Sequence, residues 1–209
     1  MQTLLIESLF NDIYMQIRNN IRTITCNDLY IIKERFYRKC DEYKGNTDNL
    51  TGLTELLVAM FLKAFKDELN IKYTIKSDVK KIGYNNKENT IDYAFLSKDN
   101  KIKYGISVKR GAGSVQLKDH EKNTEVINKF KSNITVVQDL FRLDNIKKGS
   151  HGSFKSVTII FKAVKIGKHL STMDDIVSNY DEYEHNYIIL EGNNENLFNQ
   201  LKEKLKINH

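Results

Sequence analysis

The 209-residue sequence lacks proline and tryptophan altogether and has only two cysteines, Cys26 and Cys40. Two cysteines cannot form the disulfide framework that stabilises small secreted domains, and neither has a Cys or His neighbour at zinc-ligand spacing. The composition therefore excludes a disulfide scaffold and a zinc-finger module. It favours a protein that works in a reducing, intracellular compartment.

Long hydrophobic runs are also missing. No stretch reaches the roughly 18 apolar residues that cross a bilayer, and acidic residues interrupt the apolar pattern of residues 1–20, which argues against a signal peptide. We therefore expect no contact with a membrane. The content of 40% hydrophobic and 29% charged residues is ordinary for a globular domain, and the net charge of +6 is compatible with nucleic-acid binding without establishing it.

Apolar residues recur at helical spacing through the first third of the chain and at strand spacing from residue 71 onward. The predicted helices cover 4–17, 27–43, 53–65, 116–131 and 194–207. The predicted strands cover 71–84, 90–97, 101–110, 157–167 and 185–192, with a loop over 144–156. Helices followed by a sheet with flanking helices predict one α/β or α+β domain. Its parts are a helical segment (1–45), a core (51–166) and a C-terminal strand and helix (167–209).

The segment IDYAFLSKDNKIKYGISVKR, Ile91 to Arg110, predicts two strands joined by a tight turn at Asp99 and Asn100. A four-residue loop about the same centre gives the same register. That register sets Leu96 opposite Lys103, Ala94 opposite Gly105 and Asp92 opposite Ser107. A slip of one residue would move every side chain to the other face, so the prediction depends on this turn.

In that register Asp92, Ser107 and Lys109 share one face of the hairpin, and Gly105 leaves open space beside them. One interpretation is a surface ion pair of little energetic consequence. The other is a metal-dependent phosphodiesterase site, in which the aspartate binds Mg²⁺ and the lysine positions or deprotonates the attacking water.

Asp92, fourteen intervening residues and then Ser107-Val108-Lys109 at the end of an apolar strand resemble the signature of the PD-(D/E)xK nuclease superfamily. That superfamily includes most type II restriction endonucleases, Holliday junction resolvases and several repair nucleases. The resemblance covers about 53–166. It implies a restriction-endonuclease-like core with a mixed central sheet flanked by helices, a Mg²⁺ ion held by Asp92 and the Val108 backbone carbonyl, and Lys109 as the catalytic lysine.

Two positions depart from the signature: Ile91 replaces the proline, and Ser107 replaces the second acid. A hydroxyl is a weaker Mg²⁺ ligand than a carboxylate, so we expect Ser107 to contribute through its backbone neighbourhood more than through its hydroxyl. Mg²⁺ sites often use one or two protein carboxylates plus water and substrate phosphate. Another acid is the second possibility.

Glu55 is the candidate substitute acid, since many members of the superfamily carry a glutamate on the first core helix. It equally fits a carboxylate that the helix dipole favours in a first turn. Asp78, one strand earlier, is an alternative acid that also reads as an ordinary strand-end aspartate.

Basic and polar residues near the predicted site are candidates for DNA contacts. Phosphate contacts of this kind supply affinity without sequence information. The loops that carry them read equally well as solvated connectors. The candidates are Arg110, Gln116, Lys118, His120, Lys147 and Lys148.

From the resemblance we expect a Mg²⁺-dependent, sequence-specific endonuclease of double-stranded DNA, most like a type II restriction enzyme, leaving 5′-phosphate and 3′-hydroxyl ends in the cytoplasm of a bacterium or archaeon. A palindromic target would imply a homodimer, with residues 1–43 as the dimerising element. The alternatives are a junction resolvase or repair nuclease of the same core, and a non-catalytic DNA-binding protein with a degenerate core, which Ser107 favours. A protein-interaction domain with no DNA role is the third.

Overall fold

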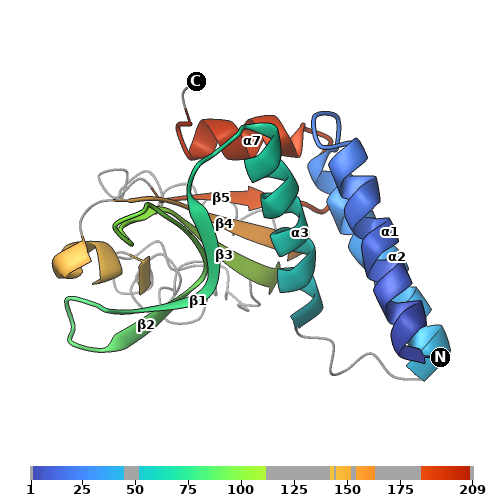
Figure 1. Ribbon diagram of the computed structural model, residues 1–209, viewed down its shortest axis with the longest axis horizontal. Coiled ribbons are helices and arrows are strands. Elements are labelled where there is room, and N and C mark those ends of the chain that lie inside the picture. Colours follow the sequence, from blue (N-terminus) through green and yellow to red (C-terminus); the bar gives the residue numbers. More distant parts are fainter. Residues whose placement is uncertain are drawn as a thin grey trace, which may run out of the picture.

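A mixed five-stranded sheet lies at the centre of the structure, a computed structural model that describes residues 2–44, 52–111, 142–143, 145–151, 154–162 and 185–207 (Figure 1). The strands are β1 (Thr74–Ile82), β2 (Glu88–Leu96), β3 (Ile102–Gly111), β4 (Lys155–Lys162) and β5 (His185–Ile189). The helices are α1 (Gln2–Asn19), α2 (Cys26–Lys44), α3 (Gly52–Glu68) and α7 (Leu197–Lys204), with a short irregular helical turn, η1 (Lys147–His151).

The strands follow one another across the sheet in chain order, from β1 to β5. The first three strands form an antiparallel meander, whereas β4 is parallel to β3 and β5 is parallel to β4. With helices on the sheet and a helical part at the N-terminus, the prediction of a mixed sheet in an α/β or α+β fold is confirmed. The helix predicted over 116–131 lies outside the described residues.

The four long helices, α1, α2, α3 and α7, gather on one face of the sheet (Figure 1). Helix α3 contacts β3, helices α1 and α2 contact α3, and α7 contacts β4 and β5. One hydrophobic cluster runs through all of these elements. A second, smaller cluster lies around β2 and β3 and includes the segment that leads into β4: Ile91, Ala94, Leu96, Ile102, Leu143, Ile146 and Phe154.

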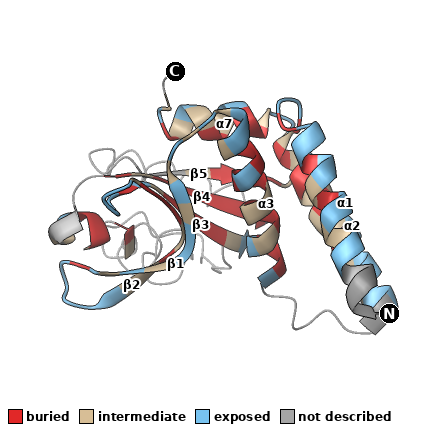
Figure 2. Cartoon of the chain, in the orientation of Figure 1, coloured by how far each residue is buried: buried red, intermediate tan, exposed pale blue. Residues whose placement is uncertain are grey.

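Burial increases from the β1 edge toward β4 (Figure 2). In β4 every position from Ser156 to Phe161 is buried, which matches its nearly continuous apolar run and its place between two strands. In β1 most positions are exposed. Lysines on this edge strand, including Lys76, Lys80 and Lys81, discourage pairing with another sheet.

The N-terminal helices use their apolar stripes inside the chain. Ile13 and Ile17 of α1 and Leu29, Ile32 and Phe36 of α2 are buried in the main cluster. The helical spacing predicted from these residues is confirmed, and their burial needs no second chain. A homodimer through residues 1–43 stays a prediction.

A reciprocal cap starts α2. Asp28 Oδ2 accepts hydrogen bonds from Thr25 N (2.8 Å) and Thr25 Oγ1 (2.7 Å), and Thr25 Oγ1 accepts one from Asp28 N (3.0 Å). This is the capping-box arrangement of a helix N-terminus. A bridge between Thr25 and Asn196 then joins the turn before α2 to the start of α7.

The loop predicted over 144–156 is partly wrong. Within the described residues, 145–151 are helical, and β4 begins at Lys155. Gly149 allows this segment to lie directly on the β1–β2 turn, since a Cβ there would stand 2.9 Å from the Ile82 carbonyl oxygen. The glycine-rich composition therefore reflects close packing here, not only a solvated connector. In the described part of the chain, no helix has the length and apolarity to cross a membrane.

Candidate functional site

Asp92 is fixed where β2 and β3 stop pairing. The regular pairing between these strands reaches Tyr93 opposite Ile106. At the next level, Asp92 Oδ2 accepts hydrogen bonds from the backbone N–H of Val108 (2.7 Å) and from Ser107 Oγ (3.0 Å). The Asp92 side chain thus accepts the hydrogen bond from Val108 N–H that a backbone carbonyl of a paired strand would otherwise accept. This fixes the carboxylate, whose side chain is 17% exposed, against the end of β3.

The hairpin reaches this register by a different route from the predicted one. The turn has three central residues, closed by Ser97 N donating to Lys101 O (3.0 Å), with Asn100 at φ +57°. Such a turn with a left-handed third residue is common in hairpins. It offsets the register by one residue, and a bulge next to Leu96 restores it.

Two predicted pairs can therefore be compared with the structure directly. Ala94 pairs with Gly105, as predicted, whereas Leu96 pairs with Ile102 and not with Lys103, so that pair was wrong. The predicted facing of Asp92 and Ser107 agrees with the 3.0 Å hydrogen bond between them.

Two cations flank the Asp92 carboxylate. Lys109 Nζ lies 3.9 Å from Oδ2, and Arg142 Nη2 lies 3.9 Å from Oδ1. Arg142 Nη2 also donates a hydrogen bond to Ser107 Oγ at 2.7 Å. All three charged side chains are mostly enclosed, with exposures of 17% for Asp92, 18% for Lys109 and 25% for Arg142.

Ser107 connects the members of this site through its hydroxyl. It is fully buried, donates to Asp92 and accepts from Arg142. The backbone N–H of Val108 and the hydroxyl of Ser107 both bind Asp92, so the expectation that the backbone neighbourhood matters more than the hydroxyl stays a prediction. Neither Arg142 nor this contact was predicted, because residues 142 and 107 belong to separate elements and no local pattern links them.

The expected open space beside Gly105 is filled. A Cβ at this position would stand 2.7 Å from Cε2 of the buried Phe154 ring and 3.5 Å from Ile91 Cγ2. Glycine is needed here because the ring packs onto the strand.

Glu55 lies in the first turn of α3, and its electrostatic surroundings include the site. Glu55 is exposed, and partial desolvation together with the carboxylates of Asp92 and Asp78 raises the pKa of its carboxyl, while Lys109 and Arg110 oppose them. Glu55 is therefore close enough to interact electrostatically with Asp92 and Lys109. The same position in a first turn also fits the alternative role in which the helix dipole stabilises the carboxylate.

Tyr93 links α3 to the hairpin at this place. Its hydroxyl donates to the Glu55 backbone carbonyl at 2.9 Å. Burial, followed by the charges of Glu55, Asp78 and Asp92, raises the pKa of Tyr93 to about 12. Asp78 interrupts the β1–β2 pairing with φ +51°, between the pairs that flank Asp92 on β2. Three carboxylates, from α3, β1 and β2, thus act electrostatically on one tyrosine.

Asp92 and Glu55 are the carboxylates of this neighbourhood that could hold a metal ion. Among the described residues no group of three His, Cys, Asp or Glu side chains stands close enough to hold a metal ion. Arg142 Nη2 lies 3.9 Å from Asp92 Oδ1, which is longer than a hydrogen bond. The negative charge of Asp92 raises the pKa of Glu55. A bound cation would relieve this repulsion between the two carboxylates. Oxygen ligands with one or two carboxylates are what Mg²⁺ uses when phosphate and water complete its shell.

The predicted DNA-contacting residues lie in different settings. Arg110 and Lys148 are exposed, and Arg110 Nη2 lies 3.5 Å from the Tyr37 hydroxyl. Lys147 is only 6% exposed, and its amine donates to Ser156 Oγ at 3.1 Å and lies 5.2 Å from the centre of the Phe154 ring. Lys147 therefore supports the fold and does not face solvent, contrary to the prediction. Gln116, Lys118 and His120 lie outside the described residues.

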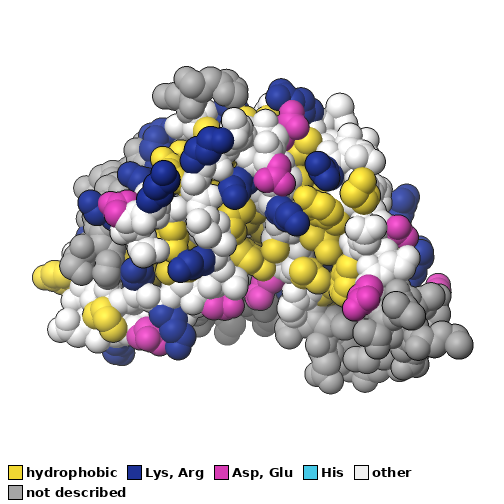
Figure 3. Space-filling view, in the orientation of Figure 1, with side chains coloured by type: hydrophobic (Ala, Val, Ile, Leu, Met, Phe, Trp, Pro, Cys, Tyr) yellow, Lys and Arg dark blue, Asp and Glu magenta, His cyan; other side chains and the backbone are white. Residues whose placement is uncertain are grey.

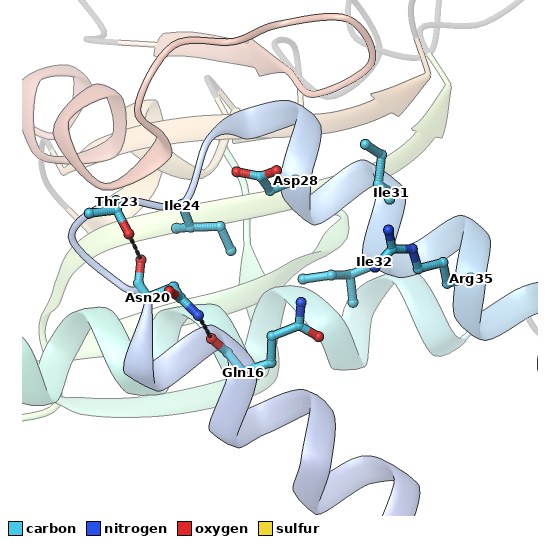
Figure 4. A pocket seen from close by; sticks show the side chains of 8 residues that line it. All are labelled: Gln16, Asn20, Thr23, Ile24, Asp28, Ile31, Ile32 and Arg35. Atoms are coloured by element: carbon cyan, nitrogen blue, oxygen red, sulfur yellow. Dashed lines mark hydrogen bonds between the residues drawn. The ribbon is translucent and has the colours of Figure 1, made fainter.

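Charges of both signs are interspersed over the face shown in Figure 3, with Lys and Arg more numerous than Asp and Glu. A cavity of about 300 Å³ lies elsewhere, between α1 and α2, and is lined by Gln16, Asn20, Thr23, Ile24, Asp28, Ile31, Ile32 and Arg35 (Figure 4). The Asp28 carboxylate in its wall is engaged by the α2 cap. None of the predicted site residues lines this cavity.

No protein-family model matches the chain, and no curated protein matches it either. Among solved structures, the crystal structure of protein VC1899 from Vibrio cholerae is similar at 12% sequence identity and a TM-score of 0.36. The alignment covers 95% of this chain and 56% of that one, so this chain spans little more than half its length. A similarity at this level carries no argument about the site.

Proposed function

We propose that the protein is a Mg²⁺-dependent endonuclease of double-stranded DNA, built on a PD-(D/E)xK core and most like a type II restriction enzyme. The observation that carries the proposal is the enclosed pair of Asp92 and Lys109. The two side chains come from neighbouring strands and lie 3.9 Å apart where those strands stop pairing. A surface ion pair would be more exposed than 17% and 18%, and it would not need the buried hydrogen bonds that hold Asp92.

In this proposal Asp92, the Val108 carbonyl and the Glu55 carboxylate would hold the metal ion. When bound, Mg²⁺ supplies Lewis-acid charge to the phosphate and lowers the pKa of a bound water. Lys109 would position the attacking water through its ammonium group, and the proton of that water would pass to solvent. Val108 N–H and Ser107 keep Asp92 in place, so that the carboxylate need not reorganise during the reaction. Hydrolysis breaks the P–O3′ bond, which leaves a 5′-phosphate and a 3′-hydroxyl.

The exposed basic residues, including Arg110 and Lys148, would contact the DNA backbone. A palindromic target would bring two copies together through a two-fold axis. Sedimentation of the protein with and without its DNA would test that homodimer directly.

The experiment is a digest of a long viral DNA of known sequence, and of a four-way junction, with Mg²⁺ or with EDTA. The variants are Lys109→Ala and, as a matched control, Lys103→Ala, which removes an exposed lysine from the same strand. Discrete Mg²⁺-dependent bands made by wild type and Lys103→Ala but not by Lys109→Ala are expected. Cleavage confined to the junction would select a resolvase of the same core. Cleavage by Lys109→Ala at the wild-type rate would refute the proposal.

One observation favours a second candidate, a DNA-binding protein that does not cut. Ser107 stands where the superfamily has an acid. Its hydroxyl accepts a hydrogen bond from Arg142, and this places the guanidinium 3.9 Å from Asp92 Oδ1. Salt-sensitive binding of both DNAs by wild type, without cleavage of either, would establish this alternative in place of the nuclease.

A further inference from the structure

We propose that Arg142 is a phosphate-binding residue of the Asp92–Lys109 site, held in place by the Ser107 hydroxyl that replaces the second acid. The inference rests on the proposed function and adds a substrate-contacting cation to it. Its observations are the 2.7 Å hydrogen bond from Arg142 Nη2 to Ser107 Oγ and the 3.9 Å approach of the same nitrogen to Asp92 Oδ1.

The chemistry of position 107 explains why a serine suits an arginine here. A hydroxyl has one proton to donate and lone pairs to accept with, so Ser107 can donate to Asp92 and accept from Arg142 at once. A carboxylate at 107 has no proton to donate and would place a second negative charge against Asp92. The serine therefore exchanges one metal-binding acid for one fixed guanidinium.

The positions of Lys109 and Arg142 beside Asp92 then indicate where a phosphate would bind. Lys109 approaches one oxygen of Asp92 and Arg142 approaches the other, so two cations flank a single carboxylate. The carboxylates of Glu55 and Asp78 act in the same neighbourhood, so the site offers carboxylates for a metal ion and, at Lys109 and Arg142, cations for a phosphate. A guanidinium has five N–H donors in a planar fork that matches phosphate oxygens.

The arrangement gives Arg142 a defined part in the reaction. The scissile phosphodiester would lie beside Asp92, with Lys109 on the side of the attacking water and Arg142 on the phosphate oxygens. Negative charge that grows on those oxygens in the transition state would be stabilised by a cation that is already in place. In this way Arg142 supplies charge that a second metal ion would supply at a site with two acids.

The test combines DNA binding and cleavage in four variants: Arg142→Gln, Arg142→Lys, Ser107→Ala and, as a control, Arg18→Gln on the exposed face of α1. The probe is a short fluorescein-labelled duplex containing the cleaved sequence. Its anisotropy is measured with Ca²⁺ over a range of salt, and single-turnover cleavage is measured with Mg²⁺. Thermal melting shows whether each variant is folded.

Arg142→Gln is expected to reduce the slope of log affinity against log salt by about one and to slow cleavage by about 10²–10³-fold. Arg142→Lys restores the slope because it keeps the charge, but it leaves cleavage slow because the fork is lost. Ser107→Ala keeps the slope and slows cleavage. A residue with only a structural role would change melting without this separation of slope from rate.

Wild-type slope and wild-type cleavage in a folded Arg142→Gln would overturn the inference. If Lys109→Ala also cuts normally, the proposed function fails with it, whereas loss of cleavage in Lys109→Ala alone leaves the function standing without Arg142. If Arg142→Gln does not fold, a folded Arg142→Lys that cuts at the wild-type rate is sufficient to overturn the inference.

Discussion

Replacing Gly105 by alanine tests whether the Phe154 ring packs directly on β3 beside the site. The glycine has no left-handed backbone angle, so alanine is conformationally allowed there. Its Cβ would nevertheless stand 2.7 Å from Cε2 and 3.2 Å from Cδ2 of the ring, whereas carbon atoms in good contact are about 3.5–4.0 Å apart. The ring cannot turn away freely, because it is 2% exposed and packs against the Lys147 amine.

Overpacking of this kind costs about 1–3 kcal/mol, and lower backbone entropy in the unfolded chain returns about 0.5–1 kcal/mol of it. The net loss is centred on about 1 kcal/mol, which should lower Tm by about 2–4 °C in a protein of this size. Gly111→Ala is the control on the same strand, since its Cβ would meet Lys162 atoms at an ordinary 3.8 Å. Differential scanning calorimetry of both variants measures the difference.

A double-mutant cycle identifies the ring as the cause. Phe154→Leu should be destabilising alone, yet it should reduce the cost of Gly105→Ala, because the shorter side chain leaves room for the new methyl group. Strictly additive effects, or a Gly105→Ala protein as stable as wild type, would refute the packing of Phe154 on β3.

Two further outcomes follow from the titrating groups. Burial raises the pKa of the Cys26 thiol to about 12, so in a Cys40→Ser background the thiol should react with a disulfide reagent only on unfolding, and rapid labelling of the native protein would contradict its burial. The pKa of Glu55 in the folded protein is raised above 4.5. The stability contributed by the protonated form of Glu55 is therefore complete below that pH, and it is lost as the pH rises through the folded-state pKa. Glu55→Gln should therefore match wild type in Tm at acid pH and exceed it at neutral pH; an unchanged difference between the two conditions would show that Asp92 and Asp78 do not act on Glu55.

Long periodic segments made most of the fold predictable. The apolar spacing of α1 and α2 and the alternation of β2 and β3 each report a local preference that tertiary packing then uses. The register around Asp92 agreed with the prediction although the turn did not. Asn100 adopts a left-handed conformation in a three-residue turn, and a bulge beside Leu96 cancels the resulting offset.

Contacts between segments that are distant in the sequence could not be predicted from local periodicity. Whether Gly105 faces open space or a ring depends on Phe154, which arrives from the segment before β4. Lysine 147 looked like a solvated charge in a glycine-rich loop, but its segment is helical and its amine is bound to Ser156. Arg142 showed no signal at all, because nothing in the sequence around it indicates that its guanidinium would reach Ser107.

The most direct test of the nuclease proposal is the single-turnover cleavage rate of Asp92→Asn, Lys109→Ala and the double variant, measured with Mg²⁺ on one DNA substrate. If the two residues form one active site, each single change should slow cleavage by about 10²–10⁴-fold. The double variant should then be no slower than the worse single one, since residues that act as a unit are not additive. Cleavage at the wild-type rate by either single variant would contradict an active site at the β2–β3 hairpin.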